Sequence, residues 1–228
     1  MELIIIIVAI IAIIVIYSIM NMKIKELKAI ALNQKLNEIA KKLPTNKEIC
    51  EQILEKIGNK TTKIEENENS EVTLYIAVQD KITIGNTHNS FTRIQTVAHE
   101  CLHSIQDKKM LIFNFIFSNI YLVFFIIICI LTVCKKLSNE IMYSNIFLIL
   151  SLIYYVIRIF LENDAMIKAQ FLAKEYMQES KYIGNSEIDK IYHGFEELNK
   201  ECVKGTNCSL FIGIMIKLVI FNTLALIF

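Results

Sequence analysis

Four stretches of this chain are long and apolar enough to cross a lipid bilayer, and they restrict its fold more than any other feature. A membrane-spanning helix needs roughly 20 mainly apolar residues. The only charged side chains within the four stretches are Arg158 and Lys217. With a single proline and six glycines in 228 residues, we expect a mainly α, multi-span membrane protein. The stretches cover residues 3–20, 110–134, 141–161 and 210–228.

Lysines outside these stretches indicate how the chain crosses the bilayer. Lysines are enriched on the cytoplasmic side of membrane proteins. The group of lysines that follows the first stretch therefore places the N-terminus outside and residues 21–109 in the cytoplasm. Lys108 and Lys109 hold the start of the second stretch on the same side. The lysines of the first group are Lys23, Lys25, Lys28, Lys35, Lys41 and Lys42.

This orientation predicts a multi-pass protein of the cell membrane that consists of five parts. Two transmembrane helices lie at the ends of the chain and a transmembrane helical hairpin lies between them. A cytoplasmic α+β region precedes the hairpin, and a cytoplasmic helical region follows it. The boundaries are residues 1–21, 22–109, 110–161, 162–209 and 210–228 in chain order.

Periodicity predicts the elements of the cytoplasmic parts. One helix is expected over residues 22–43, ended by Pro44, and a second over residues 46–57, capped by Thr45 and stopped by Gly58. Two further helices are expected, over residues 165–180 and 186–202.

Between these helices the pattern changes. The polar residues 59–70 read as a flexible loop, and alternation over residues 71–85 predicts a strand pair or hairpin. Residues 86–89, which include His88, read as a turn. Ser90 is the expected cap of a helix that begins near Phe91. The strand over residues 81–85 is either a plain structural strand or an edge for an extended peptide.

The sequence Thr96-Val-Ala-His-Glu-Cys-Leu-His103 on that helix contains an HExxH motif. The i, i+4 spacing brings His99 and His103 to one face, where two imidazoles can hold one Zn²⁺. Glu100 flanks the same face, so it can take a proton from the zinc-activated water and later return it. Cys101 reads as a packed spacer. Since none of the six cysteines forms a CxxC pair, a structural thiolate zinc site is not expected.

A catalytic zinc also needs a third protein ligand and an open position. Glu162 is the best candidate, because the hairpin returns it to the depth at which the HExxH helix meets the membrane. An i, i+4 salt bridge with Arg158 is its alternative role. The two arms of the hairpin differ in length by roughly 15 Å at 1.5 Å per residue. We therefore expect a break, bend or strong tilt within residues 106–114.

Two supporting roles have several candidates. Asp107 or Asp164 can accept the free N–H of a ligating histidine, or can be a solvated carboxylate at the membrane interface. A donor for the oxyanion of the transition state is also needed. The candidates for it are His193, Tyr192, Tyr176 and Tyr182.

The order of these elements resembles a known family. The segment Ala98-His-Glu-Cys-Leu-His-Ser-Ile-Gln-Asp107, then a membrane hairpin and then Glu162-Asn-Asp-Ala165 is similar to the YugP-type neutral zinc metallopeptidases of bacterial membranes, with a gluzincin-like HExxH and a distant glutamate. The resemblance implies a zincin-like cytoplasmic region with His99, His103 and Glu162 as zinc ligands and Glu100 as the base. This chain departs from the usual form, which has Ala-Gly where Cys101-Leu102 stand.

Three functions follow from these features. The first is a zinc metalloendopeptidase that hydrolyses a protein or peptide substrate at the cytoplasmic membrane face. The second is a non-catalytic zinc-binding membrane scaffold or pseudo-protease, with a closed fourth coordination position. The third is a small transporter that uses Lys217, Arg158 and Glu162 as a polar path. A net charge of +1 without a basic run argues against a nucleic-acid partner.

Overall fold

The computed structural model describes residues 1–20, 24–87 and 90–228. Contacts divide the chain into two compact units. The described residues are mainly helical, with one small sheet, which confirms the mainly α content that the sequence predicts. The first unit consists of Met1–Met22, Phe113–Phe160 and Lys204–Phe228, and the second of Lys23–Ile112 and Leu161–Val203.

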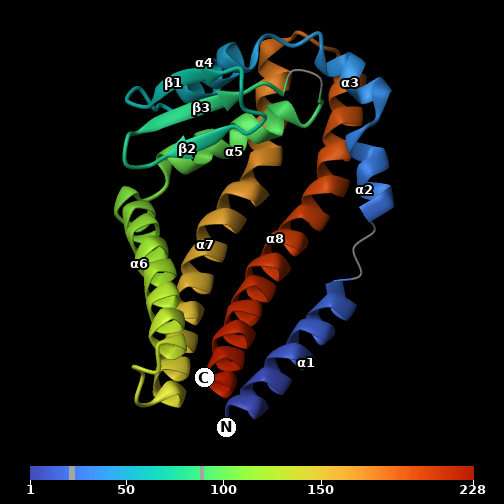
Figure 1. Cartoon of the computed structure of the whole chain (residues 1–228). Helices are drawn as coiled ribbons and strands as arrows, with labels where there is room; N and C mark the ends of the chain where they lie inside the picture. The colour runs from blue at the N-terminus through green and yellow to red at the C-terminus, as the bar shows by residue number, and fades with distance from the viewer. Residues whose placement is uncertain (21–23, 88–89) are drawn as a thin grey trace. The chain divides into compact units, whose positions relative to one another are not determined.

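Four of the described helices have the length and composition needed to cross a membrane. Each covers one of the four predicted stretches to within one residue, which indicates a membrane protein. Three of them also supply residues to the second unit. The four helices are α1 (Glu2–Met20), α6 (Lys108–Val133), α7 (Glu140–Ser180) and α8 (Asn185–Ile227), labelled in Figure 1.

Aromatic rings and a few polar pairs join the helices of the first unit. The Tyr121 ring stacks on Phe147, with ring centroids 5.2 Å apart. The Ser151 hydroxyl donates to the Tyr121 hydroxyl at 3.1 Å. In the same unit, Asn222 Nδ2 donates to Ser144 Oγ at 2.9 Å. Such hydrogen bonds between helices are a common means of association in an apolar environment.

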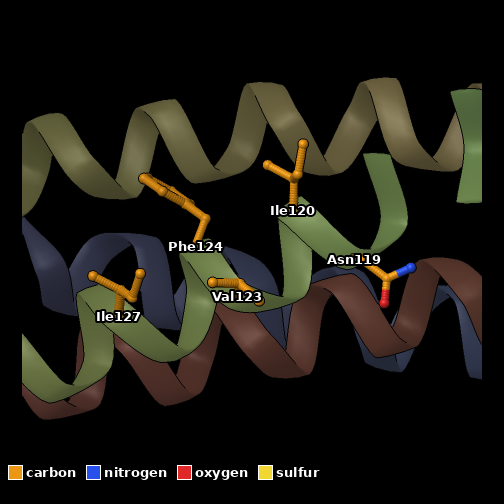
Figure 2. Close-up of a pocket in the computed structure, with 5 residues that line it drawn as sticks. All are labelled: Asn119, Ile120, Val123, Phe124 and Ile127. Carbon is orange, nitrogen blue, oxygen red and sulfur yellow. The ribbon is translucent and has the colours of Figure 1, made fainter. Parts of the chain in front are cut away.

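A shallow hollow of about 380 Å³ also lies in the first unit. Figure 2 shows its lining side chains along one side of α6. The lining is hydrocarbon apart from one amide and includes no titratable group, so this hollow lacks the residues for hydrolytic chemistry. The residues are Asn119, Ile120, Val123, Phe124 and Ile127.

The second unit contains a three-stranded sheet in the order β1-β3-β2. Strand β2 (Leu74–Ile76) pairs antiparallel with β3 (Lys81–Gly85), which confirms the predicted strand pair. Strand β1 (Lys63–Asn67) pairs parallel with β3 along its whole length. Because β3 has a partner on both sides, it presents no edge to a peptide, and that alternative prediction was wrong.

The predicted loop over residues 59–70 was also wrong, since it contains β1. Only Ile64 of its five residues is partly buried, and the others are exposed. An exposed edge strand shows no apolar alternation, because its side chains remain in water and only its backbone is paired. Lys81 on β3 pairs with Glu65 across the ladder at 2.7 Å.

Helices before the sheet follow the prediction in part. Instead of one helix over residues 22–43, the described residues form α2 (Ile24–Ala31) and α3 (Gln34–Ala40). The side chain of Asn33 accepts hydrogen bonds from the first turn of α3, so this residue starts a new helix rather than continuing the old one. The expected start at Met22 and the turn residues His88 and Asn89 lie outside the described residues.

The second predicted helix is confirmed as α4 (Asn46–Lys56). Thr45 and Glu48 form a capping box at its start, which satisfies two backbone donors reciprocally. Gly58 follows its end with φ +73°, a conformation that glycine adopts without strain.

The HExxH helix is α5 (Arg93–Ile105), which contacts α4, β2 and β3 and runs alongside the sheet in Figure 1. Thr92, not Ser90, is its N-cap residue. Helix α5 ends before Gln106, whose backbone is extended at ψ 164°, and α6 begins at Lys108. The predicted break after the active-site helix is therefore confirmed.

The two helices predicted after the hairpin are confirmed as helical, but each is part of a longer helix. The third apolar stretch and the predicted helix over residues 165–180 form the single helix α7. Likewise, the predicted helix over residues 186–202 and the fourth stretch form the single helix α8. No proline interrupts either segment, and the polar stretches between their apolar parts keep helical hydrogen bonds.

A buried arginine at the start of α5 forms hydrogen bonds with the end of α3, the α3–α4 connection and the start of α4. Arg93 is 3% exposed. Its guanidinium donates to the carbonyl oxygens of Ala40, Leu43 and Pro44 and to the side chain of Asn46, at 2.8–3.0 Å. Carbonyl dipoles thus take the place of water around this charge.

We predict that Arg93→Met destabilises the protein by about 3 kcal/mol or more, because it leaves buried acceptors without a donor. The measurement is the thermal unfolding of detergent-purified full-length protein. Lys41→Met is the matched control, since it removes a cation from the exposed Lys41–Glu38 pair and should change stability by less than about 1 kcal/mol. Equal melting temperatures for wild type and Arg93→Met would show that the hydrogen bonds of Arg93 do not stabilise the protein.

Candidate metal centre

Helix α5 brings two imidazoles of the HExxH motif together. One face of the helix is buried by side chains that are 0% exposed, including Ile94, Val97 and Cys101. The other face carries His99 and His103, whose Nε2 atoms are 3.0 Å apart. Their rings are nearly perpendicular, at 89°. Burial of one helix face therefore fixes the direction of both imidazoles.

Helix α7 supplies the third side chain from within the same unit. Glu162 Oε2 lies 3.5 Å from His99 Nε2 and 3.7 Å from His103 Nε2. The three side chains are 11–18% exposed. The structure thus brings together the three residues that the sequence proposed as ligands, and they form a group that can hold a metal ion.

The size of this group fits a small divalent cation. Ligand atoms about 2.05 Å from a tetrahedral zinc lie about 3.3 Å apart. The distances among His99 Nε2, His103 Nε2 and Glu162 Oε2 are 3.0, 3.5 and 3.7 Å, which lie on both sides of that value. Two imidazole nitrogens and one carboxylate oxygen suit zinc and also other first-row transition metals. The geometry thus supports metal binding without selecting the element.

Glu100 lies beside this group with its carboxylate held in place. Its Oε2 accepts a hydrogen bond of 2.7 Å from the backbone N–H of Tyr75 on β2. Its Oε1 lies 3.9 Å from His99 Nε2. Burial raises the pKa of Glu100, against the opposing influence of His99 and His103. One oxygen is thus anchored by the sheet and the other lies nearer the imidazoles.

Gln106 also contacts the group, and this contact was not predicted from the sequence. Its Oε1 lies 2.8 Å from His103 Nδ1. The sequence signal for this contact was the i, i+3 spacing of Gln106 from His103. The backbone donor of Tyr75 carries no signal in the sequence, because any residue except proline has this group.

The two aspartates proposed as partners of the histidines have different surroundings. Asp107 accepts from the backbone N–H of Met110 at 2.9 Å and so caps α6. Asp164 accepts from Gln106 Nε2 at 3.1 Å and pairs with Lys168. Asp164 is therefore connected to His103 through Gln106 rather than directly.

Three of the four proposed oxyanion donors contact other side chains, and the fourth, Tyr182, is exposed. The His193 side chain is 72% exposed and lies next to Glu196 and Glu197. Tyr176 donates to Gln52, and the Tyr192 ring lies under the ammonium of Lys174. Tyr182 is 48% exposed. None of these contacts links one of the four side chains to the metal-ligand group.

Cys101 faces away from the imidazoles. Its Sγ is 3.7 Å from Sγ of Cys50 on α4, and both residues are fully buried. The hydrogen bond with Cys50 and burial raise the pKa of the Cys101 thiol. A buried neutral thiol is a packing residue rather than a nucleophile.

No protein-family model matches this chain, and comparisons with curated proteins and with solved structures find no match.

We predict that metal binding weakens as the pH falls through a raised pKa of His103. Burial lowers this pKa, but Glu162, Gln106 and the charge of Glu100 outweigh burial and raise it. The protonated imidazole competes with the metal, so zinc affinity should begin to fall above the ordinary imidazole pKa of about 6.5. The measurement is chelator competition over a pH series.

The exposed His193 provides the control for this pH series. His193→Ala should reproduce the wild-type profile, because this side chain is 72% exposed and its neighbours are Glu196 and Glu197, which are not ligand residues. A wild-type affinity that stays constant until the pH is well below about 6.5 would contradict the assigned direction.

Proposed function

We propose that this protein is a membrane-bound, zinc-dependent metalloendopeptidase that hydrolyses peptide bonds. One observation carries the proposal: three ligand side chains from α5 and α7 converge while the neighbouring Glu100 remains outside the group, held by β2. A purely structural site is usually closed by four protein ligands, whereas a catalytic one has three and an open position. The sequence resemblance to YugP-type neutral zinc metallopeptidases agrees with this proposal.

The chemistry divides between the metal and the side chains of the chain. A bound zinc ion supplies a Lewis acid that polarises the scissile carbonyl and lowers the pKa of the attacking water. Glu100 receives the proton of that water on Oε1 and delivers it to the leaving amine. The hydrogen bond from Tyr75 N–H fixes the carboxylate, so little reorganisation is needed at the moment of proton transfer.

The lysine distribution supports a cytoplasmic active site in a multi-pass protein of the cell membrane. Lys108 and Lys109 precede the apolar part of α6 directly and follow the HExxH helix. Since lysines favour the cytoplasmic side, we place the ligand group at the cytoplasmic membrane face. The expected substrate is a protein or peptide that reaches this face.

We predict that Glu100→Gln lowers turnover by about 10²-fold or more, because the amide cannot accept the proton. Zinc content should remain at the wild-type level, since Glu100 is not one of the three ligand residues. The measurement combines cleavage of unfolded fluorescein-labelled casein with zinc analysis of full-length protein in lipid nanodiscs.

Glu55→Gln is the matched control, because it makes the same change at an exposed position of α4. It should retain both activity and zinc. If Glu100→Gln cleaved casein as fast as the wild type, Glu100 would not be the base. If the wild type held zinc but cleaved no unfolded protein or peptide, the non-catalytic scaffold would replace the peptidase.

A further inference from the structure

Gln106 lies where α5 ends and contacts His103 in two ways. Its backbone N–H donates to the carbonyl oxygen of His103 at 3.2 Å. Its side-chain Oε1 lies 2.8 Å from Nδ1 of the same histidine. The side chain is partly buried, so its amide contacts are protected from competition with water.

The other partners of this amide determine its orientation. Gln106 Nε2 lies 2.9 Å from the carbonyl oxygen of Leu161 and 3.1 Å from Oδ2 of Asp164. A carbonyl and a carboxylate only accept hydrogen bonds, so the –NH₂ group of Gln106 must face them. Oε1 therefore faces His103 as an acceptor, and Nδ1 of His103 carries a proton.

This arrangement settles which nitrogen of His103 is available to a metal. With Nδ1 donating to Gln106, Nε2 of the neutral imidazole carries no proton and offers its lone pair to a metal. Nε2 is also the atom that lies near His99 and Glu162. The hydrogen bond and the ligand geometry thus select the same tautomer.

The same amide also contacts α7 on both sides of the third ligand. Leu161 precedes Glu162 directly, and Asp164 follows it by two residues. Gln106 therefore joins the end of α5, which carries two ligands, to the turn of α7 that carries the third. Asp164 also pairs with Lys168, one turn further along α7.

We propose that Gln106 is a positioning residue of the metal centre, which fixes the His103 tautomer and holds the ligands of α5 and α7 in register. This inference rests on the proposed zinc-dependent function. Removing a hydrogen-bond partner of a ligating histidine typically weakens metal affinity by about 10–100-fold. Gln106→Leu should therefore weaken zinc binding by about that factor.

A second glutamine of α5 provides a matched control. Gln95 Nε2 donates to Oδ1 of Asn199 on α8 at 3.1 Å. Gln95→Leu thus also removes an amide hydrogen bond between α5 and a neighbouring helix, but it leaves the partners of His103 unchanged. If Gln106 contributed only to packing between helices, Gln106→Leu and Gln95→Leu would have the same zinc affinity.

A paired exchange tests the hydrogen-bond roles themselves. In the double variant Gln106→Glu with Asp164→Asn, a carboxylate accepts from His103 Nδ1 and the new amide donates to that carboxylate. The hydrogen bond from His103 is therefore kept, although the bond to Leu161 and the Asp164–Lys168 ion pair are lost. This variant should recover zinc affinity to within about fivefold of wild type, given the 10–100-fold scale of the loss.

The experiment measures zinc affinity by chelator competition for full-length wild type and the three variants in lipid nanodiscs, with thermal unfolding recorded in parallel. We expect Gln106→Leu to lose zinc affinity, Gln95→Leu to keep the wild-type affinity and the double variant to recover it. Equal affinities of Gln106→Leu and wild type, or equal losses in both leucine variants, would overturn it while the peptidase proposal stands. A wild type without zinc would overturn both.

Discussion

Burial of one face of α5 is the interaction on which the site depends. Ile94, Val97, Ala98 and Cys101 are fully buried, and burial of each large aliphatic side chain contributes about 1.5–3 kcal/mol. With this face packed against α4 and the sheet, the opposite face must present His99 and His103. Arg93 fastens the start of the helix, and Gln106 holds its end next to α7.

The local parts of the site were predictable from the sequence. His99 and His103 belong to one helical turn, so their proximity follows from spacing alone. Glu162 is distant in the chain, and its placement required the apolar stretches to be read as a returning hairpin. The structure brings it within 3.5 Å of His99. The break after α5 followed from unequal arm lengths, and the extended backbone of Gln106 confirms it.

Features that depend on backbone groups or on exposed surfaces were not predictable. Strand β1 has charged side chains and is identified only by its pairing with β3. The anchor of Glu100 is the backbone N–H of Tyr75, which no residue type signals. Asn33 interrupts a regular apolar pattern through local hydrogen bonds of its side chain. Periodicity reports which face is buried, and so it is insensitive to all three features.

Zinc content per chain shows whether His99, His103 and Glu162 form a metal centre. Full-length wild type, His103→Ala and Glu162→Ala would be purified with zinc supplied during expression and analysed by mass spectrometry of the metal. We expect about one zinc per wild-type chain and loss of zinc from both variants, because each variant removes one of three ligands. A wild type without zinc, or a Glu162→Ala variant that binds it as tightly as wild type, would contradict the three-ligand centre.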